Sequence, residues 1–130
     1  MAEKHKLAEL QLAIMHVLWE QGAATVAEVR KALAPQRRLA HTTVATMLAK
    51  LEVKGHVTRQ SDGRVNVYRP KLRREQVTRT MVADLVQRLF AGDVAEMACH
   101  LVDAGDVSRE SLARLKKLIR QKEEELKRGE

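Results

Sequence analysis

The chain has 130 residues, enough for one domain or for a small domain with an appendage, and its hydrophobic content of 45% is ordinary for a globular protein. It carries a net charge of +7 with one Phe, one Tyr and one Trp, so we expect an aliphatic core rather than an all-β sandwich. Because no segment approaches the ~20 apolar residues of a spanning helix or resembles a secretory signal, we expect a soluble, cytoplasmic protein without direct membrane insertion.

The first 35 residues contain the patterns of two helices. Apolar residues at helical spacing predict a first helix over residues 7–20, which Gly22 helps to end. Thr25 and Glu28 have the spacing of a capping box, in which each side chain satisfies a free amide at the helix start. A second helix is therefore expected to begin after Thr25 and to end before Pro35, since the residue before a proline is disfavoured in helical geometry.

A third helix and a hairpin are predicted next. The helix is expected over residues 41–54, with Val44, Met47, Leu48 and Leu51 facing inward, and with the following glycine as its left-handed stop. Residues 56–60 and 64–69 alternate β-branched and polar side chains around a Ser-Asp-Gly turn, which is a strong hairpin signal. Three helices followed by a hairpin is the order of a winged helix-turn-helix, whose third helix enters the DNA major groove.

After Pro70 the pattern is helical to the end of the chain. We therefore expect a mainly α fold with a small β-hairpin, in which residues 1–70 form an N-terminal winged helix-turn-helix and residues 71–130 a C-terminal three-helix dimerisation region. Short amphipathic helices cannot bury their apolar faces alone, so they pack either on the winged helix or on a second chain, and we favour the homodimer. The residues expected to contribute to dimerisation are Val77, Met81, Leu85, Leu89, Met97, Leu101, Leu112, Leu115 and Ile119.

The net positive charge is concentrated in one stretch. Residues 30–69 contain nine Lys or Arg against two acidic residues, whereas residues 71–130 are nearly balanced, with 13 basic and 11 acidic residues. Clustered basic residues bind nucleic acid by releasing counterions from its phosphates. A homodimer would present two third helices to two half-sites, so the expected partner is a pseudo-palindromic, double-stranded DNA operator.

The residues expected to bind DNA are Arg38, His41, Thr42, Thr43, Thr46, Lys50, Lys54, Arg59 and Arg64. Threonines early in the third helix can reach phosphates or thymine methyls, although one of the first two could instead cap the helix. The lysines are expected at phosphates, and the two wing arginines at the backbone or the minor groove. Because no arginine lies on the reading face, we expect specificity to come from thymine methyls, DNA shape or half-site spacing.

Patterns of catalysis and of metal binding are not found in the sequence. It has no Gly-rich phosphate loop, no paired carboxylates in an apolar setting and no nucleophile elbow, so we expect neither an enzyme nor a bound cofactor. The five histidines are scattered without metal-ligand spacing, so no metal site is expected. Cys99 is the one cysteine, and we expect it to be a small buried core residue.

Four segments carry a family resemblance. They are LAELQLAIMHVLWEQGAATVAEVRKAL, TTVATMLAKLEVKGHVTR, DGRVNVYRP and LVQRLFAGDV. Together they resemble the BlaI/MecI penicillinase-repressor family of bacterial transcription regulators over about residues 7–126. The resemblance implies an N-terminal winged helix, a C-terminal dimerisation region, and a homodimer that binds operator dyads and represses resistance or stress genes.

The resemblance also implies a mode of release. In the family a membrane sensor protease triggers cleavage of the helical tail at an Asn-Phe bond, and the aligned pair in this chain is His100-Leu101. Because that pair differs, the resemblance supports DNA binding and dimerisation more directly than any inducer. Two alternatives stay open from the residues alone: a winged helix used as a protein-interaction module, and a small-molecule-sensing regulator with a ligand pocket in its tail.

Overall fold

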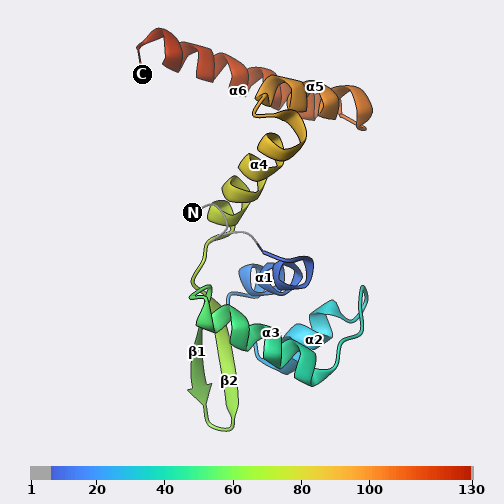
Figure 1. Cartoon of the computed structure of the whole chain (residues 1–130), viewed down its shortest axis with the longest axis vertical. Coiled ribbons are helices and arrows are strands. Elements are labelled where there is room, and N and C mark those ends of the chain that lie inside the picture. Colours follow the sequence, from blue (N-terminus) through green and yellow to red (C-terminus); the bar gives the residue numbers. More distant parts are fainter. Residues whose placement is uncertain (1–6, 130) are drawn as a thin grey trace. The chain divides into compact units, whose positions relative to one another are not determined.

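The computed structural model describes residues 7–129, and it forms two compact units, the first ending at Leu85 and the second beginning at Val86. Over these residues the fold is mainly α with one antiparallel hairpin, as the sequence predicts (Figure 1). The elements are α1 (Glu9–Gln21), α2 (Val26–Leu33), α3 (His41–Val53), β1 (Val57–Asp62), β2 (Val65–Pro70), α4 (Arg74–Phe90), α5 (Val94–Ala104) and α6 (Arg109–Lys127). None of the described helices is both long and apolar enough to cross a bilayer.

The start of α2 is fixed by the predicted capping box. The Thr25 hydroxyl accepts a hydrogen bond from the Glu28 amide at 3.1 Å, and the Thr25 amide donates to the Glu28 carboxylate at 2.8 Å. Val29 and Leu33, one turn apart on the same face, are buried in the core. The cap thus sets the residue at which the helix begins, and the apolar pair sets the face that it turns inward.

Thr25→Ala is expected to lower the free energy of unfolding by about 1 kcal/mol, because the substitution removes the hydroxyl that satisfies a helix amide. Urea unfolding followed by circular dichroism, at one fixed protein concentration, measures the change. Thr78→Ala is the matched control, since Thr78 is exposed inside α4. Equal effects of the two substitutions would mean that the capping box contributes nothing to stability.

Helix α3 presents one apolar face to the core of the first unit. Val44, Leu48 and Leu51 are fully buried there, as their spacing predicts. The residue before the helix is Ala40, whose side chain makes no capping hydrogen bond. Neither Thr42 nor Thr43 therefore caps the helix, and the capping role considered for one of them is not observed.

The hairpin is joined by the two residues Gly63 and Arg64, with Asp62 paired to Val65 across the turn. Gly63 has a φ of +71°, which suits a glycine at the first position of a tight hairpin turn. The predicted turn began at Ser61, so the observed turn lies later in the chain. Ser61 and the residue after it are in fact the last two residues of β1.

The first unit continues past the hairpin. The Trp19 indole N–H donates to the Leu72 carbonyl at 2.8 Å, and both Leu72 and Val77 belong to the same buried cluster as the core of α1–α3. Val77 is 2% exposed and Met81 packs against this cluster, so these two predicted dimerisation residues are covered within their own chain. The beginning of α4 therefore stabilises the winged helix.

The second unit exposes most of its apolar side chains. Both of its last two helices have N-terminal caps. At the start of α5 the Asp93 carboxylate accepts a hydrogen bond from the Glu96 amide, and at the start of α6 the Ser108 hydroxyl accepts one from the Ser111 amide, both at 3.0 Å. However, neither α5 nor α6 contains a buried residue. Cys99 is exposed on α5, so the expectation that it is a core residue is wrong. No neighbouring element within the described residues of the second unit covers that part of the helix.

Candidate nucleic-acid interface

The face of α3 opposite the core carries most of the residues predicted to contact DNA. His41, Thr42, Thr46, Lys50 and Lys54 are all exposed. With 100° of rotation per residue, they spread across the side of the helix that the buried apolar residues leave free. Thr43, the remaining candidate from this helix, is partly buried at the edge of that face. The helix thus presents hydroxyls, methyls and two ammonium groups to solvent.

Two further residues complete the centre of this face. Ala49 and Val53 are exposed, Val53 by 87%, and they continue the line of Thr42 and Thr46 at helical spacing. These two residues were not predicted, because only polar and basic side chains were expected at DNA. Their helical spacing from Thr42 and Thr46 would have placed them on the same face. Their methyl groups make the centre of the face less polar than its edges.

The loop before α3 is held by hydrogen bonds from arginine side chains. Arg30 of α2 donates its Nε–H to the Leu39 carbonyl at 3.0 Å, two residues before the helix starts. Arg37 forms an ion pair with Glu9 at 2.9 Å. The neighbouring Arg38 is exposed and forms no ion pair with any residue that the structure describes. Of these arginines, Arg38 is the one that makes neither bond, so its whole guanidinium is available to a phosphate.

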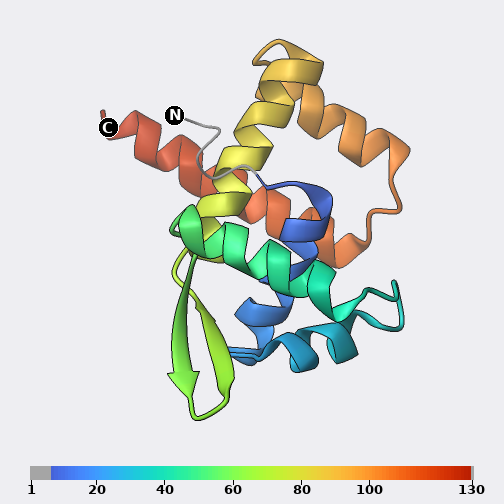
Figure 2. The ribbon, with the colours of Figure 1, turned by 60° about the horizontal axis from the view of Figure 1, so that its bottom comes forward.

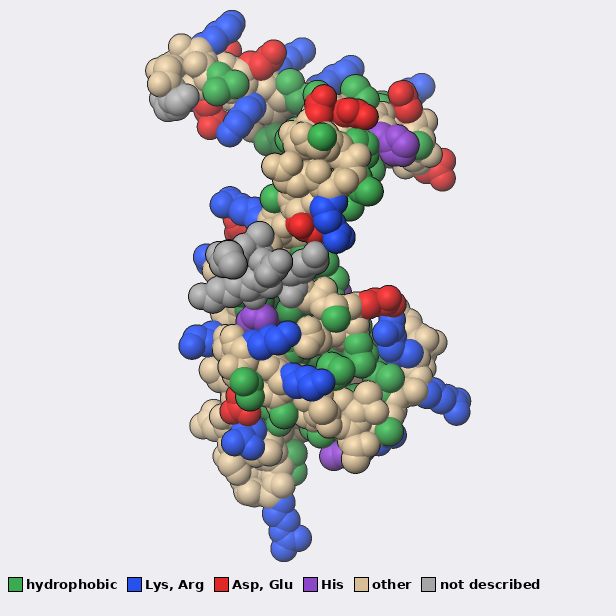
Figure 3. Space-filling model, in the orientation of Figure 1, with side chains coloured by type: hydrophobic (Ala, Val, Ile, Leu, Met, Phe, Trp, Pro, Cys, Tyr) green, Lys and Arg blue, Asp and Glu red, His purple; other side chains and the backbone are tan. Residues whose placement is uncertain are grey.

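The wing adds two arginines in different settings. Arg64 is exposed in the turn, and the tip of the wing is basic in the space-filling view (Figure 3). Arg59 on β1 lies 3.5 Å from the carboxylate of Glu52 on α3, which partly neutralises its charge. Arg64 is thus the stronger candidate for a phosphate or minor-groove contact.

The hairpin and α3 are joined at a buried corner. The His56 amide donates to the Leu51 carbonyl at 2.9 Å, and the His56 carbonyl accepts from the Lys71 and Leu72 amides. His56 therefore joins the end of α3, the hairpin and the segment after it by backbone hydrogen bonds. Figure 2 shows α3 along its length, with the hairpin extending from the end at which α3 finishes. All nine predicted DNA-binding residues lie in α3, at its C-terminal cap, in the loop before it or in this hairpin.

The other predicted sites fall mostly in exposed parts of the chain. Leu85, Leu89, Leu101, Leu115 and Ile119 are exposed, with Leu89 at 67% and Leu101 at 57%, whereas Met97 and Leu112 are partly buried. His100 and Leu101 are both exposed inside α5, and cleavage between them stays a prediction. Within residues 7–129 no three His, Cys, Asp or Glu side chains are grouped as metal ligands would be.

Comparisons with known proteins agree over most of the chain. The penicillinase repressor family matches residues 7–121. The transcriptional regulator BlaI of Mycobacterium tuberculosis (strain CDC 1551 / Oshkosh) is 34% identical over 122 residues, with 88% of each chain covered. The penicillinase repressor of Bacillus licheniformis is 24% identical over 114 residues, covering 88% of this chain and 89% of that one.

One solved structure in the comparison contains a DNA fragment. It is the complex of monomeric Bacillus licheniformis BlaI with the blaP half-operator, which is 30% identical in sequence, with a TM-score of 0.47. The match covers 54% of this chain and 85% of that chain. The family match and the identity to the mycobacterial regulator together establish the relationship: this chain belongs to the penicillinase repressor family.

Proposed function

We propose that this protein is a transcriptional repressor that binds a double-stranded DNA operator with α3 and the wing, and that it does so as a homodimer. The observation that carries the proposal is the exposed face of α3 beside a basic wing, in a chain of the penicillinase repressor family that is similar to the penicillinase repressor of Bacillus licheniformis. Bound over a promoter, such a dimer represses by occluding the DNA.

Each part of the face has a role that follows from its chemistry. Thr42 and Thr46 present hydroxyls and methyls that suit base edges and thymine methyls. Lys50 and Lys54 present ammonium groups that suit phosphates, which position the protein without reading sequence. Arg64 at the wing tip reaches toward the flanking backbone or minor groove.

The exposed apolar side chains of the second unit support the homodimer. Leu89, Leu101 and Ile119 are each more than half exposed, and α6 adds further exposed leucines. Apolar surface of this extent on a soluble chain marks an interaction site. A symmetric partner would cover it with the same surface from a second copy, and the two copies of α3 would then read two related half-sites.

Selection from random-sequence DNA tests this proposal. The protein, with its oligomeric state determined by sedimentation, is incubated with the DNA pool at near-physiological salt, and the bound fraction is sequenced. We expect an enriched dyad bound by a dimer. Binding without any enriched sequence would contradict the repressor and favour a basic winged helix that serves as a protein-interaction module.

A further inference from the structure

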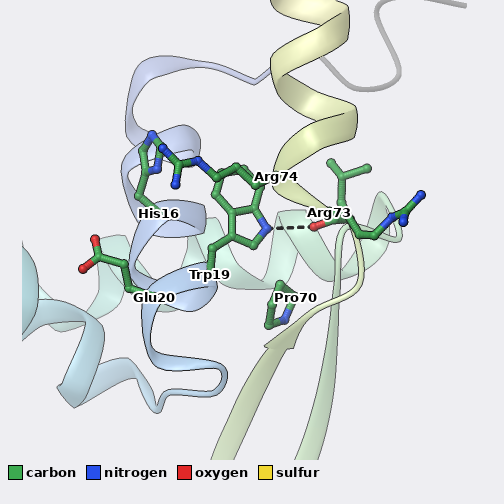
Figure 4. Close-up of a pocket in the computed structure, with 7 residues that line it drawn as sticks. His16, Trp19, Glu20, Pro70, Arg73 and Arg74 are labelled. Carbon is green, nitrogen blue, oxygen red and sulfur yellow. Dashed lines mark hydrogen bonds between the residues drawn. The ribbon is translucent and has the colours of Figure 1, made fainter. Parts of the chain in front are cut away.

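A half-open pocket lies in the first unit, away from the exposed face of α3. It encloses about 440 Å³ and is lined by residues of α1, the end of β2, the segment that follows β2 and the first residue of α4. Figure 4 shows Trp19 at its centre, with His16 on the preceding turn of α1 and Arg74 on α4. The proposed DNA-binding face uses none of these residues, so the pocket needs a separate explanation.

Two rings form a rigid wall of this pocket. The Trp19 indole is partly buried, and its N–H is engaged by the Leu72 carbonyl at 2.8 Å, which holds the ring in place. The His16 imidazole meets it edge-on, with ring centroids 5.4 Å apart and an interplanar angle of 83°. A flat aromatic molecule is the kind of ligand that stacks on, or packs edge-on against, such a wall.

The charge in the pocket is cationic. In Figure 4 the Arg74 side chain extends from α4 toward His16, whereas the Glu20 carboxylate points away from the indole. The structure gives Arg74 no ion pair with a described residue, in contrast to Arg79 on the same helix, which pairs with Glu75 at 3.1 Å. A guanidinium without a carboxylate partner, beside an aromatic wall, suits the planar fork of a carboxylate.

We propose that this pocket binds a small, planar aromatic carboxylate. The carboxylate pairs with the Arg74 guanidinium while the ring lies against the Trp19 indole. Both features are required together: a neutral ring lacks the ion pair, and a compact anion lacks the aromatic contact. The proposal is independent of the DNA-binding function, because it rests on residues outside α3 and the wing.

Tryptophan fluorescence measures binding in this pocket directly, because Trp19 is the one tryptophan in the sequence. Three probes are titrated into the full-length protein while the tryptophan emission is followed: benzoate, the neutral benzamide of the same shape, and inorganic phosphate. We expect a saturable change with benzoate, and no saturation over the same concentrations with benzamide or phosphate. Absence of saturation with benzoate, or equal saturation by any other probe, would overturn the proposal.

Two substitutions on α4 locate the binding. Arg74→Gln is expected to weaken benzoate binding about tenfold, as the loss of a charge-assisted hydrogen bond does. Arg79→Gln removes the same charge from the same helix outside the pocket, and it is expected to leave benzoate affinity unchanged. The indole N–H resonance in the nitrogen-15 NMR spectrum shows that each variant keeps the bond to Leu72. Equal affinities of the two variants would place benzoate elsewhere and contradict the assignment.

Discussion

Leu115→Glu combined with Ile119→Glu is expected to convert the protein to a monomer and to weaken its binding to a two-half-site operator about a hundredfold or more. Both side chains are exposed in the single chain, and they lie one turn apart on α6. Two carboxylates in an apolar interface would have to be buried without partners, which strongly disfavours association. A monomer then loses the avidity that comes from binding two linked half-sites.

Sedimentation velocity and binding to the selected DNA measure the two effects. The substitutions leave α3 intact, so affinity for a single half-site is expected to stay unchanged. Ala113→Glu combined with Gln121→Glu is the matched control, because it adds the same two negative charges and helical spacing places these exposed residues on the opposite side of α6. If the Leu115/Ile119 variant remains a dimer, or binds the dyad as tightly as the unmodified protein, α6 is not part of the interface.

Elements with a local cause were predicted well. The capping box placed the start of α2 at Val26, because the two hydrogen bonds that form it involve residues only three apart. The inward face of α3 followed from spacing alone, since Val44, Leu48 and Leu51 fall on one side of any α-helix. Both features depend on neighbouring residues, so the sequence contains what is needed to predict them.

Elements that depend on distant contacts were predicted less well. The wing turn lies at Gly63–Arg64, where the register pairs Asp62 with Val65, because Gly63 takes a positive φ at the first turn position; the Asp-Gly signal indicated a turn but not which two residues would form it. Val77 was assigned to dimerisation because helical spacing shows which face is apolar but not what covers it. In the structure the core of the first unit covers that residue.

In the candidate interface, too, features that depend on neighbouring residues were predicted and features that depend on distant contacts were not. Exposed threonines and lysines on α3 were predicted because they lie opposite the apolar spacing. The sequence did not reveal that Arg59 lies beside Glu52, since the two residues belong to different elements and meet only after the hairpin folds. A count of basic residues therefore overstates the charge available to DNA, and it treats Arg59 and Arg64 as equivalent when their surroundings differ.

Lys50→Ala combined with Arg64→Ala is expected to weaken operator binding by about a thousandfold near physiological salt. Each side chain is exposed and forms no ion pair with a residue that the structure describes. If each contacts one phosphate, a dimer loses four contacts, and the slope of log K against log salt falls by roughly 0.9 for each of them. Affinity measured by fluorescence anisotropy over a range of salt concentrations gives both quantities.

The slope of log K against log salt distinguishes the loss of specific phosphate contacts from a general loss of positive charge. Lys116→Ala combined with Lys127→Ala removes the same net charge from α6, outside the proposed face, and is expected to leave the slope nearly unchanged. Because phosphate contacts carry no sequence information, the variant at positions 50 and 64 should still select the same dyad, only more weakly. A changed dyad would mean that Lys50 reads bases. An unchanged slope would mean that the phosphates are met by another surface, and the proposed orientation of α3 and the wing would then be wrong.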